Sequence, residues 1–199
     1  TRTLAQRDAA LVLALAFGDL ATVQRLLPPP QVHEPLPPLA APPIAIAAFS
    51  GLARIAACRD GLRATVRWLL AHGADANTKL CVPGTDHPLP VLYGATAHAG
   101  DGEIVRALLS AGADPNDNES LYHATEQADR SILDALVQAG ARWPGTNALF
   151  RQLDHDDLPG LRQALALGAD ANELSPTGGT RPLHHEIGRA SCRERVYDD

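Results

Sequence analysis

The sequence has no methionine, only 4% aromatic residues and no run of lysine or arginine. With 17 basic against 23 acidic residues it carries no electrostatic footprint for a phosphate backbone, so we expect no nucleic acid as partner. The longest apolar stretch, Ala9 to Phe17, is too short to cross about 30 Å of hydrocarbon, and no signal-peptide pattern opens the chain. We therefore expect no membrane partner. Because the chain begins at Thr1, we also expect that its natural N-terminus is missing.

Cysteine is scarce, and the cysteines that occur form no pattern. Cys58, Cys81 and Cys192 contain no CxxC pair and no even-numbered framework, which indicates a reducing compartment and a cytoplasmic location. The eight histidines include the adjacent His184 and His185, but no HExxH motif or second cysteine cluster accompanies them. The sequence therefore predicts neither a metal site nor a cofactor.

One acidic cluster has residues that could carry chemistry. In the run from Asp154 through His155 to Asp157, carboxylates stand beside an imidazole, as general acid–base catalysis requires. The run falls at an expected turn between two helices, where aspartate also caps a helix start. No nucleophile or glycine-rich phosphate loop accompanies it. We therefore predict that the chain is not an enzyme.

What the sequence does contain is a repeat. GADAN stands at 73–77 and again at 168–172, with GADPN at 112–116 and GARWP at 140–144. Each follows a segment whose apolar residues recur at the i, i+3, i+4 spacing of one helix face. These segments read TVRWLLAHG, IVRALLSAG, ILDALVQAG and GLRQALALG. Because glycine enters the left-handed conformation at little cost, we expect each helix to end at its glycine.

A shorter helix is expected before each long one. The segments PPIAIAAFSG, SLYHATEQA, NALFRQLDHD and RPLHH begin at residues 42, 120, 147 and 181 and can be aligned position on position. Small residues in their middle, such as Ala47, Ala48 and Ala124, allow helices of neighbouring units to approach closely. The repeating unit is therefore a turn, a short helix, a longer helix and a glycine stop.

These segments resemble ankyrin repeats, because PPIAIAAFSG and RPLHH resemble the TPLHxAAxxG motif and GADAN resembles the closing turn. SLYHATEQ and residues 145–165 also resemble a bacterial subset of ankyrin proteins. The resemblance implies an all-α solenoid of helix pairs whose projecting fingers make a concave, protein-binding surface. It runs from about Leu4 to His185. We assign an ankyrin-repeat domain to 1–185, with units at about 4–30, 42–77, 88–117, 118–145 and 146–172 and a partial sixth unit at 173–185.

Three segments depart from the pattern. Residues 28–43 hold eight of the 16 prolines, so we expect either a stiff loop in extended polyproline geometry or a proline-rich ligand for another domain. Residues 52–61, LARIAACRDG, are additional to the consensus and are expected to prolong the first helix of the second unit. Residues 78–90 form a long finger, which we rank first as a contact site because loops frequently carry function.

The repeat pattern stops after His185. Residues 186–196 read EIGRASCRERV, which resembles the translation of a common short-read sequencing adapter. We therefore expect 186–199 to be a non-native tail on a truncated read. The alternative is a genuine basic helix that acts as a nucleic-acid or membrane arm.

The resemblance implies contacts to another protein through the exposed ends of the short helices and through the fingers. The net charge of −6 favours a partner with a basic patch. A spacer or targeting arm of a larger enzyme is the alternative function. Trp143 either anchors a partner or packs against the next finger. The candidate contact positions are Phe49, Ser50, His98, Glu126, Gln127, Asp154 and His155 on the short helices, and Lys79, Asp86, His87, Asn118, Trp143 and Thr146 on the fingers.

Overall fold

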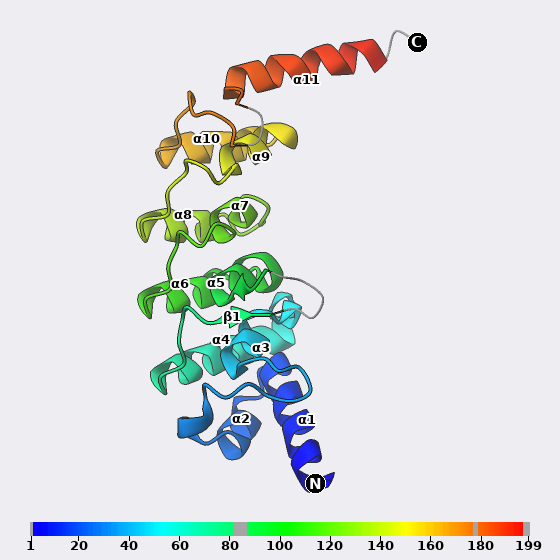
Figure 1. The fold of residues 1–199 in the computed structure, drawn as a ribbon, viewed down its shortest axis with the longest axis vertical. Coiled ribbons are helices and arrows are strands. Elements are labelled where there is room, and N and C mark those ends of the chain that lie inside the picture. The colour runs from blue at the N-terminus through cyan, green and yellow to red at the C-terminus, as the bar shows by residue number, and fades with distance from the viewer. Residues whose placement is uncertain (1, 82–86, 177–178, 197–199) are drawn as a thin grey trace.

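The computed structural model describes residues 2–81, 87–176 and 179–196 and shows a column of stacked helix pairs (Figure 1). The expected all-α repeat solenoid is confirmed, and the strands within the described residues form a single two-stranded antiparallel pair. In chain order the elements are α1 (Arg2–Phe17), α2 (Leu20–Leu26), the 3₁₀ turn η1 (Pro29–Gln31), α3 (Pro43–Ala48), the 3₁₀ turn η2 (Gly51–Arg54), α4 (Ala56–Ala71), β1 (Lys79–Leu80), β2 (Leu89–Pro90), α5 (Val91–Tyr93), the π-helical turn η3 (Gly94–Ala99), α6 (Gly102–Ser110), α7 (Ser120–Ala124), α8 (Ser131–Gln138), α9 (Ala148–Asp154), α10 (Leu158–Ala166) and α11 (Pro182–Val196).

The long helices bury the apolar stripe that their sequences predict. Val66 and Leu69 of α4, and Ile104 and Leu108 of α6, have no exposed surface. Helix α6 packs against both α4 and α8, so each stripe is covered by the neighbouring units (Figure 1). Burying one such side chain contributes about 1.5–3 kcal/mol relative to leaving it in water. The core is therefore one continuous cluster that runs the length of the column.

The closing glycines end the long helices as predicted. Gly73, Gly112, Gly140 and Gly168 have φ values of 93°, 91°, 99° and 95°, which lie in the region that favours glycine. After Gly73, Gly112 and Gly168, an aspartate two residues later fixes the turn with its own side chain. In the third unit, Oδ1 of Asp114 accepts the N–H of Asn116 at 2.9 Å. The sequence GADxN therefore codes a helix stop followed by an aspartate turn.

The asparagine of this turn joins each unit to the next. Nδ2 of Asn77 donates to Gly112 O at 2.9 Å, while its Oδ1 accepts the N–H of Asp114 at 2.9 Å. Asn116 repeats both bonds one unit later, to Gly140 O at 3.2 Å and from the N–H of Arg142 at 3.0 Å. These two asparagines form a ladder along the finger side of the column.

Trp143 takes over this linking role where the fourth unit lacks the asparagine. Pro144 occupies the asparagine position, and Nε1 of Trp143 donates to Leu167 O at 3.4 Å. The indole is consequently only 5% exposed. Of the two roles weighed for Trp143, the structure therefore supports packing and contradicts a partner anchor.

The additional residues of the second unit lengthen its second helix, and the prediction that they prolong the first helix is wrong. Helix α3 ends at Ala48, and Oγ of Ser50 accepts the N–H of Leu52 to start the separate turn η2. Ile55 is extended, with ψ of 122°, and α4 begins directly after it. Helix α4 therefore has 16 residues, whereas α6 has 9.

The proline-rich segment 28–43 packs against the column. Pro28 and Pro42 have the extended polyproline geometry expected of the segment, with ψ of 141° and 145°. Between them the chain forms η1 and a bridge from Leu36 to Ala41. Val32, Leu36 and Ala41 are all buried, at 0%, 8% and 2% exposure. The segment is therefore a folded loop with its own apolar anchors.

Helix α11 leaves the column, as Figure 1 shows at its upper end. It contacts α9, where His185 Nε2 lies 2.7 Å from Asp154 Oδ1 and Arg189 donates to Leu153 O and Asp154 O. Helix α11 begins at the position expected for the short helix of the sixth unit and continues as one uninterrupted helix to Val196.

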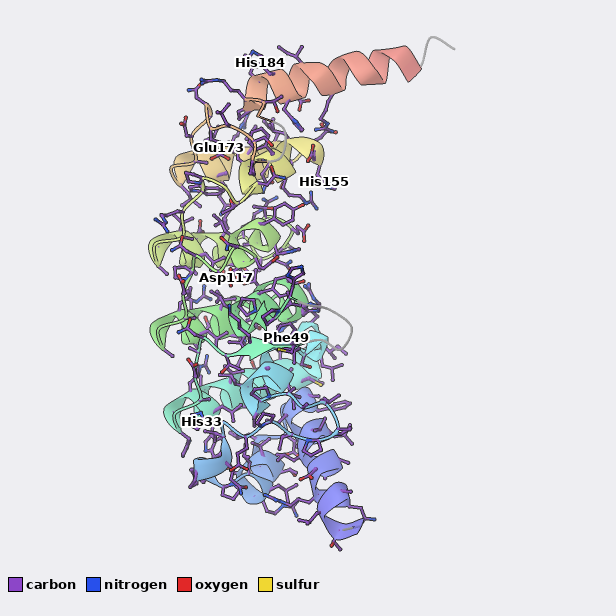
Figure 2. All side chains as sticks on the ribbon, in the orientation of Figure 1. His33, Phe49, Asp117, His155, Glu173 and His184 are labelled. Atoms are coloured by element: carbon purple, nitrogen blue, oxygen red, sulfur yellow. The ribbon has the colours of Figure 1, made fainter. Side chains whose placement is uncertain are left out.

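Glu173 gives a pH-dependent stability prediction. Both of its carboxylate oxygens are buried and have no hydrogen-bond partner among the described residues (Figure 2). Burial, and then the nearby charge of Asp170, raise the pKa of Glu173 above its ordinary value of 4.5. The folded state therefore binds the carboxyl proton of Glu173 more tightly than the unfolded state does. The free energy of unfolding consequently falls as the pH rises from the ordinary pKa of 4.5 through the raised pKa of the folded state.

We expect Glu173→Gln to raise Tm at pH 7 and to have little effect below pH 4.5, the ordinary pKa. The exposed Glu34 provides the matched control, because Glu34→Gln removes a charge without any burial. Thermal unfolding of both variants at several pH values is the measurement. A Tm difference for Glu173→Gln that is the same at every pH would contradict the prediction.

Candidate functional site

Aromatic and histidine rings from three consecutive units meet at the ends of the short helices. The Phe49 ring lies 5.3 Å from that of His98 and 6.0 Å from that of Tyr93. Tyr93 in turn lies 5.4 Å from His98 and 4.9 Å from His123. Two of the predicted contact residues, Phe49 and His98, are thus brought together. We call the rings of Phe49, Tyr93, His98, Tyr122 and His123 the ring cluster.

Charged groups border the ring cluster on the side of the fourth and fifth units. His123 Nδ1 lies 2.8 Å from Glu126 Oε2, and Arg151 Nε donates to Glu126 Oε1 at 3.0 Å. Burial on its own raises the pKa of Glu126, but the hydrogen bonds from His123 and Arg151 outweigh it and lower that pKa. Glu126 therefore stays ionised and ties α7 to α9.

His98 presents an uncharged ring to solvent. Burial, followed by the charges of His123 and Arg54, lowers the pKa of His98 below its ordinary value of 6.5. At neutral pH the imidazole is therefore neutral and can pack against an apolar partner group.

Arg54 fixes the backbone on which the ring cluster stands. Its Nε donates to His98 O at 2.9 Å, and its Nη2 donates to Ala97 O at 3.0 Å and to Gln127 Oε1 at 2.8 Å. One side chain thus connects the second, third and fourth units. The composition around it gives no sign of this role, because the three partners lie 43 to 73 residues away in the sequence.

Two of the predicted contact residues are buried for structural reasons. Gln127 is 8% exposed because it accepts from Arg54 and donates to His123 O. Ser50 is 9% exposed because its hydroxyl donates to Ala16 O at 2.6 Å. The Gln127 side chain is thus engaged within the column, and the Ser50 hydroxyl proton is already donated.

The finger residues fall into two groups. Lys79 and His87 are exposed on the long finger, whereas Asp86 lies outside the described residues. Asn118 and Thr146 come from successive fingers and line one pocket of about 270 Å³. The rest of its wall is Pro115, Asn116, Leu121, Arg142 and Pro144. Sequence reasoning named Asn118 and Thr146 separately, and the structure places them at one site.

A second pocket, of about 370 Å³, lies between two of the three segments that depart from the repeat. Leu39 and Ala41 come from the proline-rich loop, and Leu80 and Cys81 come from the long finger. The remaining wall is Ala16, Ala45, Ile46, Phe49 and Ser50, so the pocket borders the ring cluster through Phe49. We call it the insertion pocket. Among the described residues that line it, the only ionisable group is the Cys81 thiol, which is exposed.

Sequence reasoning missed the insertion pocket because it treated the loop and the finger as separate sites. The sequence contains one indication of this pocket. The proline-rich loop and the long finger flank the second unit, and each contains a leucine followed by a small residue.

The comparisons with known proteins bear on the fold. No protein-family model matches the chain, and no curated protein matches it. Among solved structures, the human ASB11 ankyrin repeat domain matches with a TM-score of 0.67 and 20% sequence identity, over 88% of this chain and 76% of that chain. The fold is an ankyrin-repeat solenoid.

Within this ankyrin-repeat solenoid, the acidic run at 154–157 serves mainly the turn between α9 and α10. Asp157 accepts the N–H of Gly160 at 3.0 Å and a bond from Arg130 at 2.6 Å. Burial would raise the pKa of Asp157, but Arg130 and the Gly160 N–H lower it further than burial raises it. Asp154 pairs with His185 at 2.7 Å, and His155 is exposed at the end of α9 (Figure 2). The carboxylates of Asp154 and Asp157 are thus engaged in structural contacts.

Over 2–81, 87–176 and 179–196, no three histidine, cysteine, aspartate or glutamate side chains are grouped as metal ligands. Over the same ranges, no helix combines the length and the apolar character that a bilayer crossing needs.

Proposed function

We propose that this chain is a protein–protein interaction module that binds its partner over the ring cluster and the insertion pocket. The observation that carries the proposal is the insertion pocket itself. An apolar pocket of about 370 Å³ falls within the size of sites that take a ligand group, and Phe49 joins it to the ring cluster.

The partner surface extends along the short-helix ends and the fingers. Rings such as Phe49 and His98 supply rigid contact area, which costs little conformational entropy to immobilise. Charged residues surround them and set the orientation of the partner. The proposed contact residues are Phe49, Lys79, His87, His98, Asn118, Glu126, Thr146, Asp154 and His155.

The chemistry of the partner follows from the lining and from the charge. The insertion pocket accepts an aliphatic or aromatic side chain, because its lining is apolar and the Ser50 hydroxyl already donates to Ala16 O. The chain as a whole has a net charge of −6, so a partner with a basic patch associates faster and more selectively.

The substitution Leu39→Asp tests this function. Leu39 lines the insertion pocket and is 50% exposed, so an aspartate there spoils the apolar pocket without opening the core. We expect it to weaken partner binding by about tenfold or more, which corresponds to about 1.4 kcal/mol. The measurement is affinity capture followed by titration with the purified captured partner.

The matched control is Leu158→Asp, which changes a leucine of 53% exposure at the other end of the column. It is expected to leave the affinity unchanged, and deletion of 78–90 is expected to reduce it. Equal affinity for the natural chain and Leu39→Asp would overturn the proposed site. A chain that captures no partner at all fits the alternative role, a spacer or targeting arm of a larger enzyme.

The proposal places residues 186–199 outside the interaction module, as a non-native tail. Glu186 stands where the aligned segments have the small buried residues Ala47 and Ala124. Sequencing of the genomic locus across the His185 codon, expected in a bacterial genome, tests this. Continuous genomic coverage into IGRASCRERV would show that α11 belongs to the natural protein.

A further inference from the structure

The fourth unit carries an arginine at a turn position where the other glycine turns carry an aspartate. Two places after the closing glycine, those turns have Asp75, Asp114 and Asp170. Each of these aspartates accepts the N–H of the residue two places further on, at 2.8, 2.9 and 2.8 Å. In the fourth unit that residue is Pro144, which has no N–H to donate. An aspartate has no such role there, and Arg142 stands in its place.

The Arg142 side chain is held at its inner end and unpaired at its outer end. Its backbone N–H donates to Asn116 Oδ1 at 3.0 Å, and its Nε lies 3.4 Å from the same oxygen. Its Nη1 and Nη2 have no hydrogen-bond or ion-pair partner in the part of the chain that the structure describes. Because a guanidinium is always charged in proteins, these two nitrogens present a positive charge with four N–H donors.

Arg142 lines the pocket of about 270 Å³ between two successive fingers, which we call the finger pocket. Among the described residues that line it, Arg142 is the only one with an ionisable side chain. Pro115, Leu121 and Pro144 give the pocket apolar walls. On the finger opposite Arg142, the exposed Asn118 amide makes no hydrogen bond to any other described residue. The volume is below that of sites for drug-sized ligands, so it suits one side chain.

Two aspartates lie on the same finger as Asn118, and neither lines the finger pocket. Asp114 Oδ1 is occupied by the turn bond to the N–H of Asn116. Asp117 Oδ1 accepts the N–H groups of Glu119 and Ser120 at 3.0 and 2.7 Å. These carboxylates therefore serve their own finger and leave Arg142 unpaired. Their charge also favours a singly charged anion over a doubly charged one in the finger pocket.

We propose that the finger pocket binds the carboxylate of one aspartate or glutamate side chain of the protein partner. The terminal nitrogens of Arg142 donate to its two oxygens, a planar pairing that matches the guanidinium, and Asn118 Nδ2 donates to one of them. This inference rests on the proposed function, because the occupant belongs to the protein partner. It gives the partner an acidic residue beside its basic patch, which fixes how the partner lies along the fingers.

Selection of random peptides displayed on phage tests the preference without knowledge of the partner. The natural chain is expected to enrich an aspartate or glutamate at one peptide position. Arg142→Glu is expected to enrich lysine or arginine at that position, because the charge of the finger pocket is reversed. The matched control is Arg162→Glu, which makes the same change of charge at an exposed residue of α10 and should keep the acidic preference.

Titration calorimetry with one selected peptide then locates the carboxylate. A version with the neutral amide in place of the acid is expected to bind the natural chain about three- to tenfold more weakly. Both versions should bind Arg142→Gln equally, because the partner of the carboxylate is absent. Asn118→Asp adds a carboxylate to the finger pocket without removing Arg142, and it should also weaken the acidic peptide. An unchanged Tm for each variant shows that the fingers are folded.

The proposal is overturned if selection on the natural chain shows no acidic preference, or if the amide version loses as much affinity on Arg142→Gln as on the natural chain. It is equally overturned if a peptide with phosphoserine at the acidic position binds the natural chain more tightly, because the finger pocket then takes a phosphate. Leu39→Asp should bind the acidic peptide as the natural chain does. Failure of the insertion pocket and failure of the finger pocket are therefore separate results.

Discussion

Replacing Gly18 with alanine is expected to lower the free energy of unfolding by about 2–6 kcal/mol, the sum of two penalties of about 1–3 kcal/mol each. Gly18 has φ of 76°, where a side chain strains the backbone. A Cβ on Gly18 would also overlap the backbone of Gly61 and Leu62 in α4. Because these are backbone atoms, no side-chain rotation relieves the overlap. The turn between α1 and α2 must then move off α4.

Gly112→Ala is the matched control. Gly112 has φ of 91°, but no atom lies within 4 Å of the position that its Cβ would take. Only the conformational penalty applies, and we expect a loss of about 1–2 kcal/mol. Urea unfolding of both variants measures the difference. Equal losses would show that the first unit accommodates the methyl group by shifting as a body.

Asp101→Ala is expected to cost about 2–4 kcal/mol, because one carboxylate performs two tasks. Oδ1 of Asp101 accepts the N–H groups of Glu103 and Ile104 at the start of α6. The same group pairs with Arg63 Nε of α4 at 2.9 Å. Asp101 is 4% exposed. Loss of a helix cap costs about 0.5–2 kcal/mol, and removing one partner of a buried pair costs about 3–5 kcal/mol.

The expected loss for Asp101→Ala is smaller than the sum of these two penalties because Arg63 is partly exposed to solvent. Its side chain is 28% exposed, so water replaces part of the lost pair. Arg63→Met isolates the pairing from the cap, and the double variant gives the coupling energy. Asp19→Ala is the matched control, because Asp19 caps α2 by accepting from Thr22 alone. A loss for Asp101→Ala no larger than that for Asp19→Ala would contradict the bridging role.

The helix stops and the repeat were predictable because they are coded locally. A glycine followed by Ala-Asp-Ala-Asn specifies a positive φ and an aspartate turn within five residues, and Gly73 and Gly168 show both. The stripes of the long helices likewise need only the spacing of apolar residues. Residues 52–61 were harder to assign, because the spacing of their apolar residues fits a continuation of either the helix before them or the helix after them. The extended Ile55 and the cap at Ser50 decide it.

The site was less predictable because distant contacts make it. Phe49 and His98 could be named from the repeat, but the ring between them, Tyr93, comes from a third position in the unit. A residue at a position that is exposed in the usual repeat can instead make hydrogen bonds within the protein. Gln127 was such a case, because Arg54 reaches it across 73 residues of sequence.

The bond from Trp143 to Leu167 has a consequence for how the column comes apart. On the finger side of the column, the boundaries after the second and third units each have two asparagine bonds, whereas the boundary after the fourth has one bond of 3.4 Å. On its helix side, this fourth boundary also has the Arg130–Asp157 and Arg151–Glu126 ion pairs. In a linear array each unit is stabilised only by its neighbours, so cooperativity passes through every boundary in turn. The fingers at the fourth boundary are therefore expected to separate before its helices, which the two ion pairs hold together.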